Sequence, residues 1–144
     1  MDGGDVMTWA TESFVSQALA QYLQAQGQGT YGTNIFADFM PESPDTLTSL
    51  TQYGGAPPPH IMMSGQYSSS ARIQLHSRAG ADDADAARTR IWDAYSTLLA
   101  ITELQQGAVR IINVSPAADP ELLEHDDRHR VLFVANLDVT YGLV

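Results

Sequence analysis

Two histidines four residues apart, His125 and His129, lie in the most charged stretch of the chain, residues 121–130. On one face of a helix, this spacing can bring two imidazole groups onto one metal ion. The stretch lies in a predicted loop before a strand, however, and no third ligand stands at a recognisable spacing. We therefore expect no metal site here, but a charged loop in which arginines pair with carboxylates, a pairing that adds little stability when exposed.

The residue patterns of the common catalytic classes are missing from the sequence. It contains no Cys, which excludes thiol catalysis, disulfides and thiolate zinc sites. No serine stands in a nucleophile-elbow pattern. Gly27, Gly29 and Gly32 follow a predicted helix instead of opening one, which is the wrong context for a phosphate-binding loop. We expect no catalytic residue and no cofactor.

One predicted strand, residues 71–78, carries polar side chains at alternate positions, and these leave a second hypothesis open. Arg72, His76 and Arg78 share one face of that strand. Together with the loop at residues 125–130 they could serve a small enzyme or a ligand-binding α+β domain. This hypothesis predicts a pocket in which both segments converge, and a histidine with a shifted pKa. A solvated strand face or a salt bridge between subunits is the simpler interpretation of the two arginines.

Composition narrows the functional class. A length of 144 residues fits one domain, residues 1–144. Seven arginines and no lysine stand against 17 acidic residues, and the net charge of -10 disfavours nucleic-acid binding. Only 17% of the residues are charged, which is typical of a surface partly covered by other subunits. The longest apolar run, residues 131–135, is far shorter than the roughly 20 residues of a membrane span. No signal peptide is visible, so we expect a cytoplasmic protein without a membrane partner.

The elements that must position these residues follow from hydrophobic periodicity. Amphipathic helices are predicted at residues 8–26, ended by Gly27 and Gly29, and at 83–102, with Asp82 as N-cap. A polar loop is predicted at residues 116–124. Strands are predicted at residues 34–40, 46–53, 71–78, 109–114 and 130–141. The predicted fold class is α+β, a mostly antiparallel sheet of about five to six strands with two helices packed on it.

The last predicted strand has the cleanest pattern in the chain. Residues 131–135 are apolar on both faces, whereas residues 136–141 are apolar on one face only. We expect the first part to be covered on both sides, and the second part to be exposed or docked on a partner.

Taken in order, these segments resemble the small minor-capsid and tail-terminator proteins that long-tailed bacteriophages encode among their head–tail joining genes. An N-terminal amphipathic helix leads into a strand that ends at Pro41, and Tyr53-Gly54-Gly55 precedes a loop. The strand at residues 73–78 is followed, after an acidic turn, by an alanine-rich helix with Ile91 and Tyr95. Pro120, the loop at 126–130 and the strand at 131–139 close the chain. The family pattern has glycine in the loop before the last strand, where this chain has His129.

The resemblance implies a structural, non-enzymatic virion protein at the head–tail junction, made in the host cytoplasm. Such proteins form a ring, typically of six subunits, that caps the tail tube and offers the surface to which the filled head attaches. The implied partners are further copies of the chain, the tail tube protein and a head-completion or connector protein. Genomic DNA passes through the lumen without specific binding, which suits an acidic subunit. A different neck role, head completion or stopper, stays open as an alternative.

Several residues are candidates for the subunit interface. Met and Tyr in irregular segments are enriched at protein–protein contacts, and polar residues on strand faces and in the charged loop could form salt bridges between subunits. The candidates are Tyr53, Met62, Tyr67, Arg72, Arg78, Arg128, Arg130 and Asp138.

Overall fold

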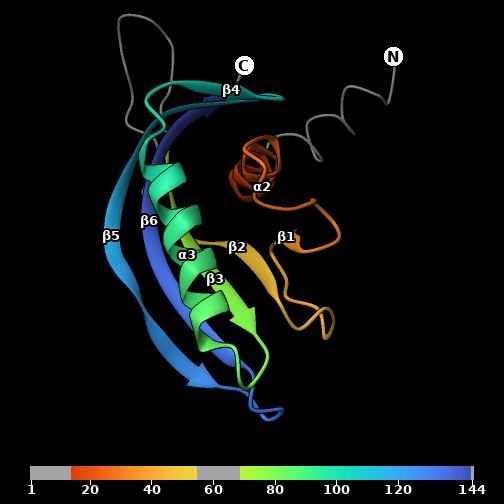
Figure 1. Ribbon diagram of the computed structural model, residues 1–144. Coiled ribbons are helices and arrows are strands. Elements are labelled where there is room, and N and C mark those ends of the chain that lie inside the picture. The colour runs from red at the N-terminus through yellow and green to blue at the C-terminus, as the bar shows by residue number, and fades with distance from the viewer. Residues whose placement is uncertain (1–13, 55–68, 144) are drawn as a thin grey trace, which may run out of the picture.

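The computed structural model describes residues 14–54 and 69–143 as one curved sheet with two helices (Figure 1). The predicted first helix is described from residue 14 onward, and its residues 8–13 lie outside the described part. The helices are α2 (Val15–Ala25) and α3 (Ala84–Leu99). The strands are β1 (Ile35–Ala37), β2 (Leu47–Gly54), β3 (Ser69–Ala79), β4 (Leu104–Gln106), β5 (Val109–His125) and β6 (Val131–Leu143).

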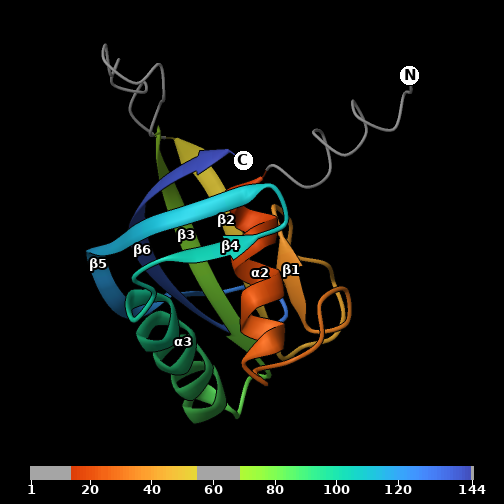
Figure 2. The same cartoon turned by 90° about the horizontal axis from the view of Figure 1, so that it is seen from above.

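The sheet has six strands in the order β1-β2-β3-β6-β5-β4. All neighbours are antiparallel except β1 and β2, which run parallel. Both views place α2 and α3 on the same face of the sheet, and α3 lies in its hollow (Figures 1 and 2). The prediction of an α+β fold with a mostly antiparallel sheet of five to six strands and two helices is confirmed. None of the described helices is long and apolar enough to cross a membrane.

The core lies between the helices and one face of the sheet, and strand alternation builds it. Ile73 and Leu75 of β3 and Leu137 of β6 are fully buried against Leu19 of α2 and Leu98 of α3. Full burial of each such side chain stabilises the fold by roughly 1.5–3 kcal/mol. The alternation predicted for β6 is confirmed, because residues 131–135 are all buried, whereas in residues 136–140 only every second side chain is.

The opposite face of the sheet, called the outer face here, carries a second and smaller set of buried residues. Strand register places Leu47 of β2, Arg78 of β3 and Leu132 of β6 in one row across the sheet. In the next row His76 stands opposite Val134. Leu47, Leu132 and Val134 are buried, yet none belongs to the main core cluster. The outer face is therefore covered over β2, β3 and β6 at this end of the sheet, and more exposed further along these strands.

The structure corrects the prediction of a polar loop at residues 116–124, because β5 is one strand from Val109 to His125. Its 17 residues run beside 13 residues of β6, and the difference of four matches four register shifts between the two strands. Each shift is a bulge, in which an extra residue bends the strand and interrupts the ladder. Bulges and edges are where a sheet tolerates proline, so Pro116 and Pro120 did not end the strand.

Smaller differences concern the element ends. The second helix begins one residue later than predicted and ends at Leu99, and its N-cap residue is Asp83 instead of Asp82, without a side-chain capping bond. The three-residue strand β4 was not predicted, because it is too short to show a period. His129 adopts a left-handed backbone with φ of 63°. Glycine favours this conformation, in agreement with the family pattern at that position.

Candidate functional site

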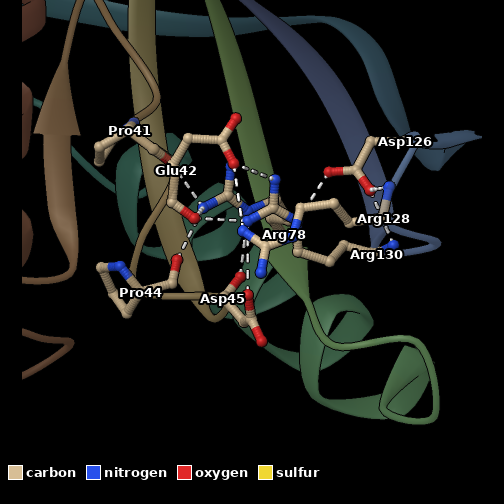
Figure 3. A network of polar contacts seen from close by, with 8 residues as sticks. All are labelled: Pro41, Glu42, Pro44, Asp45, Arg78, Asp126, Arg128 and Arg130. Atoms are coloured by element: carbon tan, nitrogen blue, oxygen red, sulfur yellow. Dashed lines mark hydrogen bonds and ion pairs between the residues drawn. The ribbon is translucent and has the colours of Figure 1, made fainter.

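The most connected polar site of the described chain is built around Arg78, at the end of β3 (Figure 3). Its guanidinium group donates only to backbone carbonyls of the loop between β1 and β2. Nη2 lies 2.6 Å from the oxygen of Pro41 and 2.7 Å from that of Pro44, and 3.2 Å from that of Glu42. Nε lies 3.2 Å from the oxygen of Asp45. Arg78 is only 4% exposed, so these bonds replace nearly all of its hydration.

Arg130 approaches the same loop from the β5–β6 turn. Its Nη1 donates to the Glu42 carbonyl at 2.5 Å, and its Nε donates to the Asp126 carboxylate at 2.7 Å. Nη1 and Nη2 also lie 3.4 Å from the carboxylates of Asp45 and Glu42. Arg130 is 4% exposed as well. Burial lowers the pKa of Arg78, and the neighbouring Arg130 lowers it further, whereas the carboxylates around Arg130 raise its own pKa against the effect of burial.

Asp126 organises the turn that presents Arg130. Its Oδ1 accepts the backbone N–H groups of Arg128 at 3.0 Å and of Arg130 at 2.9 Å. Burial acts to raise the pKa of Asp126, but these bonds and the Arg130 guanidinium hold it below its ordinary value of 3.8. The predicted pairing of arginines with carboxylates in this loop is therefore confirmed. One of these pairs is buried on the arginine side, which the prediction did not anticipate.

We expect Asp126 to contribute to the acid sensitivity of the fold. Because its pKa is lower in the folded than in the unfolded chain, its stabilising effect is present above about pH 4 and is lost as the pH falls through the folded value. An Asp126→Asn variant should be less stable at neutral pH. The difference in the free energy of unfolding between this variant and the unmodified protein should disappear on acidification. Urea unfolding between pH 7 and pH 3 measures this. A difference that stays constant over the whole range would contradict it.

The remaining interface candidates lie elsewhere. Arg72 and Asp138 face each other across β3 and β6 on the outer face, 3.6 Å apart, with side chains 62% and 44% exposed. Tyr53, near the end of β2, is 50% exposed. Arg128 is exposed and reaches Glu42 at 3.2 Å. Exposed pairs of this kind contribute about 0–1 kcal/mol, so a partner can use Arg72, Asp138 and Arg128 at little cost.

The other four candidates divide into two groups. Arg78 and Arg130 are buried and bonded within the subunit, so the structure places them in a role that joins two loops of one chain. Met62 and Tyr67 lie outside the described residues, and their part in an interface stays a prediction. Sequence reasoning missed that Arg78 binds backbone carbonyls. The available signal was the pair Pro41 and Pro44, which keeps this loop out of regular structure and leaves its carbonyls without ladder partners.

The enzyme hypothesis required that Arg72, His76 and Arg78 converge with the loop at residues 125–130. Arg78 does meet that loop, but its donors are taken by carbonyls. Arg72 lies six residues along β3, roughly 20 Å away at the usual rise of a strand. Burial lowers the pKa of His76, although Glu124 acts in the opposite direction. A histidine with a shifted pKa is thus present, but among the described residues it has no catalytic partners.

Among the described residues, neither the surface hollows nor the acidic side chains form another candidate site. One shallow hollow is lined by residues 45–46 and 80–83, and another by Phe14, Ser16, Asp38, Gln52 and Gly54. Neither contains an arginine or a histidine. Within the described ranges, no group of three or more His, Asp or Glu side chains is placed to hold a metal ion.

Comparison with known proteins gives one family and one fold. The model of the family "Bacteriophage tail terminator protein" matches residues 22–142. Among solved structures, a chain from "Virion of native gene transfer agent (GTA) particle" aligns with a TM-score of 0.66 and 14% identity, covering 90% of this chain and 96% of that one. No curated protein matches. At this identity the structural likeness shows the fold alone, whereas the family match spans most of the sequence.

The matched residues 22–142 include helix α3, the last turn of α2, the six strands up to residue 142, and both loops that Arg78 and Arg130 join. This match therefore supports the expected structural role in the virion. The chain belongs to the bacteriophage tail terminator family and is a structural protein of the phage tail or neck.

Proposed function

We propose that this chain is the subunit of a closed ring, typically of six copies, that caps the tail tube, stops its polymerisation and joins it to the filled head. The observation that carries the proposal is the family match over residues 22–142. The partners would be the tail tube protein on one side and a head-completion or connector protein on the other.

A closed ring needs two different surfaces on each subunit, which meet head to tail. The exposed candidates support this, because Tyr53, Arg72 and Asp138 lie together on neighbouring strands, whereas Arg128 lies apart from them in the turn before β6. All four are held by weak contacts or by none. Arg78 and Arg130 would act indirectly, by fixing the loop that carries Glu42, the partner of Arg128. Met62 and Tyr67 complete the proposed interface set.

The charge of the subunit also fits a ring through which DNA passes. A net charge of -10 per copy repels the phosphate backbone, so the genome would cross the lumen without being bound. All seven basic side chains are arginines that already contact groups of their own chain. This leaves the acidic residues in excess on the surface.

Light scattering on the purified chain, together with electron microscopy of particles, tests the proposal. We expect a species of about six subunit masses, either in solution or after addition of tail tubes, and antibody label at the head–tail junction. Label elsewhere on the particle would overturn the terminator role. A chain that stays monomeric both alone and on tubes would overturn the ring.

A further inference from the structure

One long edge of the sheet is free in the described structure. The edge strand β4 pairs only with residues 109–111 of β5. Beyond Ile111, β5 continues for 14 residues to His125 with β6 on one side and no described strand on the other. The backbone groups along this side are therefore available to another polypeptide, which is how strand edges recruit partners.

Apolar side chains are exposed at two bulges of β5. Ile112 and Leu123 are the extra residues of two bulges, since their neighbours in β5 face consecutive residues of β6. Ile112 is 42% exposed, and the adjacent Leu122 and Leu123 are 51% and 47% exposed. A single exposed leucine is ordinary. Two in sequence beside an unpaired edge form a patch that a partner can cover.

The same edge is acidic. Between Ile111 and His125 the chain has three carboxylates and no arginine. Asp119 accepts a hydrogen bond from the Tyr95 hydroxyl at 2.8 Å. Glu121 and Glu124 are exposed and form no ion pair among the described residues. We call Glu121, Leu122, Leu123 and Glu124 the β5 rim.

The charge of the β5 rim determines which kind of partner can bind to it. A second copy suits it poorly, because each copy carries seven arginines against 17 acidic residues, a net charge of -10, and each arginine already contacts a group of its own chain. The exposed ones pair with Asp138, Asp85, Glu103 and Glu42, and the others donate to groups within the fold. Two copies meeting rim to rim would place carboxylates side by side, which costs free energy.

We propose that the β5 rim docks an extended basic segment of a different virion protein. Apolar side chains of that segment would cover Leu122 and Leu123, its basic side chains would pair with Glu121 and Glu124, and its backbone would meet the free edge of β5. The inference rests on the proposed function in one respect, namely that the partner is taken from the assembled particle.

Photo-cross-linking in assembled particles tests the proposal. The photoreactive residue p-benzoylphenylalanine replaces Leu123 in one variant and Thr89, an exposed residue of α3, in the control. We expect the Leu123 variant to give a product with a different virion protein, identified by mass, and the Thr89 variant to give none with that protein. Adding Glu121→Arg and Glu124→Arg should reduce this product about tenfold. Asp82→Arg with Asp93→Arg, the same change of charge on exposed residues elsewhere, should leave it unchanged.

Each other outcome counts against the inference. A product between two copies of this chain would overturn the choice of occupant, and particles that contain the chain but yield no product from position 123 would overturn the docking site. In both cases the proposed function stands. Particles that lack the chain altogether would overturn the proposed function and this inference together.

Discussion

Replacing Arg78 by methionine is expected to lower the free energy of unfolding by about 3 kcal/mol. The methionine side chain fills a similar volume but donates no hydrogen bond. Four backbone carbonyls of the β1–β2 loop would lose their shared donor in a place where Arg78 is only 4% exposed. Arg130 would then face a loosened loop. Chemical denaturation followed by circular dichroism measures the loss.

Arg72→Met is the matched control, because Arg72 lies on the same strand and the same face but is exposed and forms one weak ion pair. It should change the free energy of unfolding by less than about 1 kcal/mol. Both variants must be compared in the same oligomeric state, since assembly adds its own stability. Arg78→Lys should recover little, because one ammonium group cannot reproduce the planar set of donors. Equal stability of the two methionine variants would show that other contacts hold the loop.

How much of this site the sequence could predict depends on what the partners are. The pairing of Asp126 with Arg130 is local, four residues apart, and the composition of the loop indicated it. The bonds of Arg78 join it to carbonyls 34 and 37 residues earlier. Backbone carbonyls are present at every position, and Pro41 and Pro44 indicate only that this loop leaves its carbonyls without ladder partners, not which donor they meet. Only the folded chain brings them together.

In the fold as well, local patterns could be predicted from the sequence, whereas features that depend on distant contacts could not. Helix and strand periods were sufficient for the α+β class, because both helices bury one face and residues 136–140 of β6 alternate between buried and partly exposed. They failed for β5, where bulges interrupt the period of two and prolines indicate a loop. The strand survives because β6 supplies a ladder on one side, a tertiary contact that overrides local preference. The free edge of β5, on which the docking inference rests, could therefore not be predicted.

The interface residues were predicted from residue type, and burial determines which of these residues can contact another subunit. Arginine is favoured both in interfaces and in buried networks, because its planar group satisfies several acceptors at once. Sequence therefore could not separate Arg72 and Arg128, which are exposed, from Arg78 and Arg130, which are not.

Leu137 and Asp138 are neighbours in β6 that face opposite sides of the sheet, and we expect opposite consequences from changing them. Leu137 is fully buried in the core cluster, so Leu137→Asp would place a carboxylate among apolar side chains without a partner. The expected loss is about 5 kcal/mol, which is comparable with the whole stability of many domains. Loss of the native circular dichroism spectrum, or of soluble protein, is the measurement. A folded Leu137→Asp variant would contradict the assignment of this face to the core.

Asp138→Arg, one residue further, should alter the stability of the isolated subunit by less than about 1 kcal/mol, because the exposed pair with Arg72 is weak. If the outer face of β6 takes part in the ring, this variant should shift assembly toward free subunits, as seen by light scattering. The double variant Arg72→Asp with Asp138→Arg restores the pair within the subunit but not its contacts with a neighbour. It should therefore assemble as poorly as Asp138→Arg. Normal rings from both variants would remove this face from the interface, whereas rescue by the double variant would show that only the pair within the subunit matters.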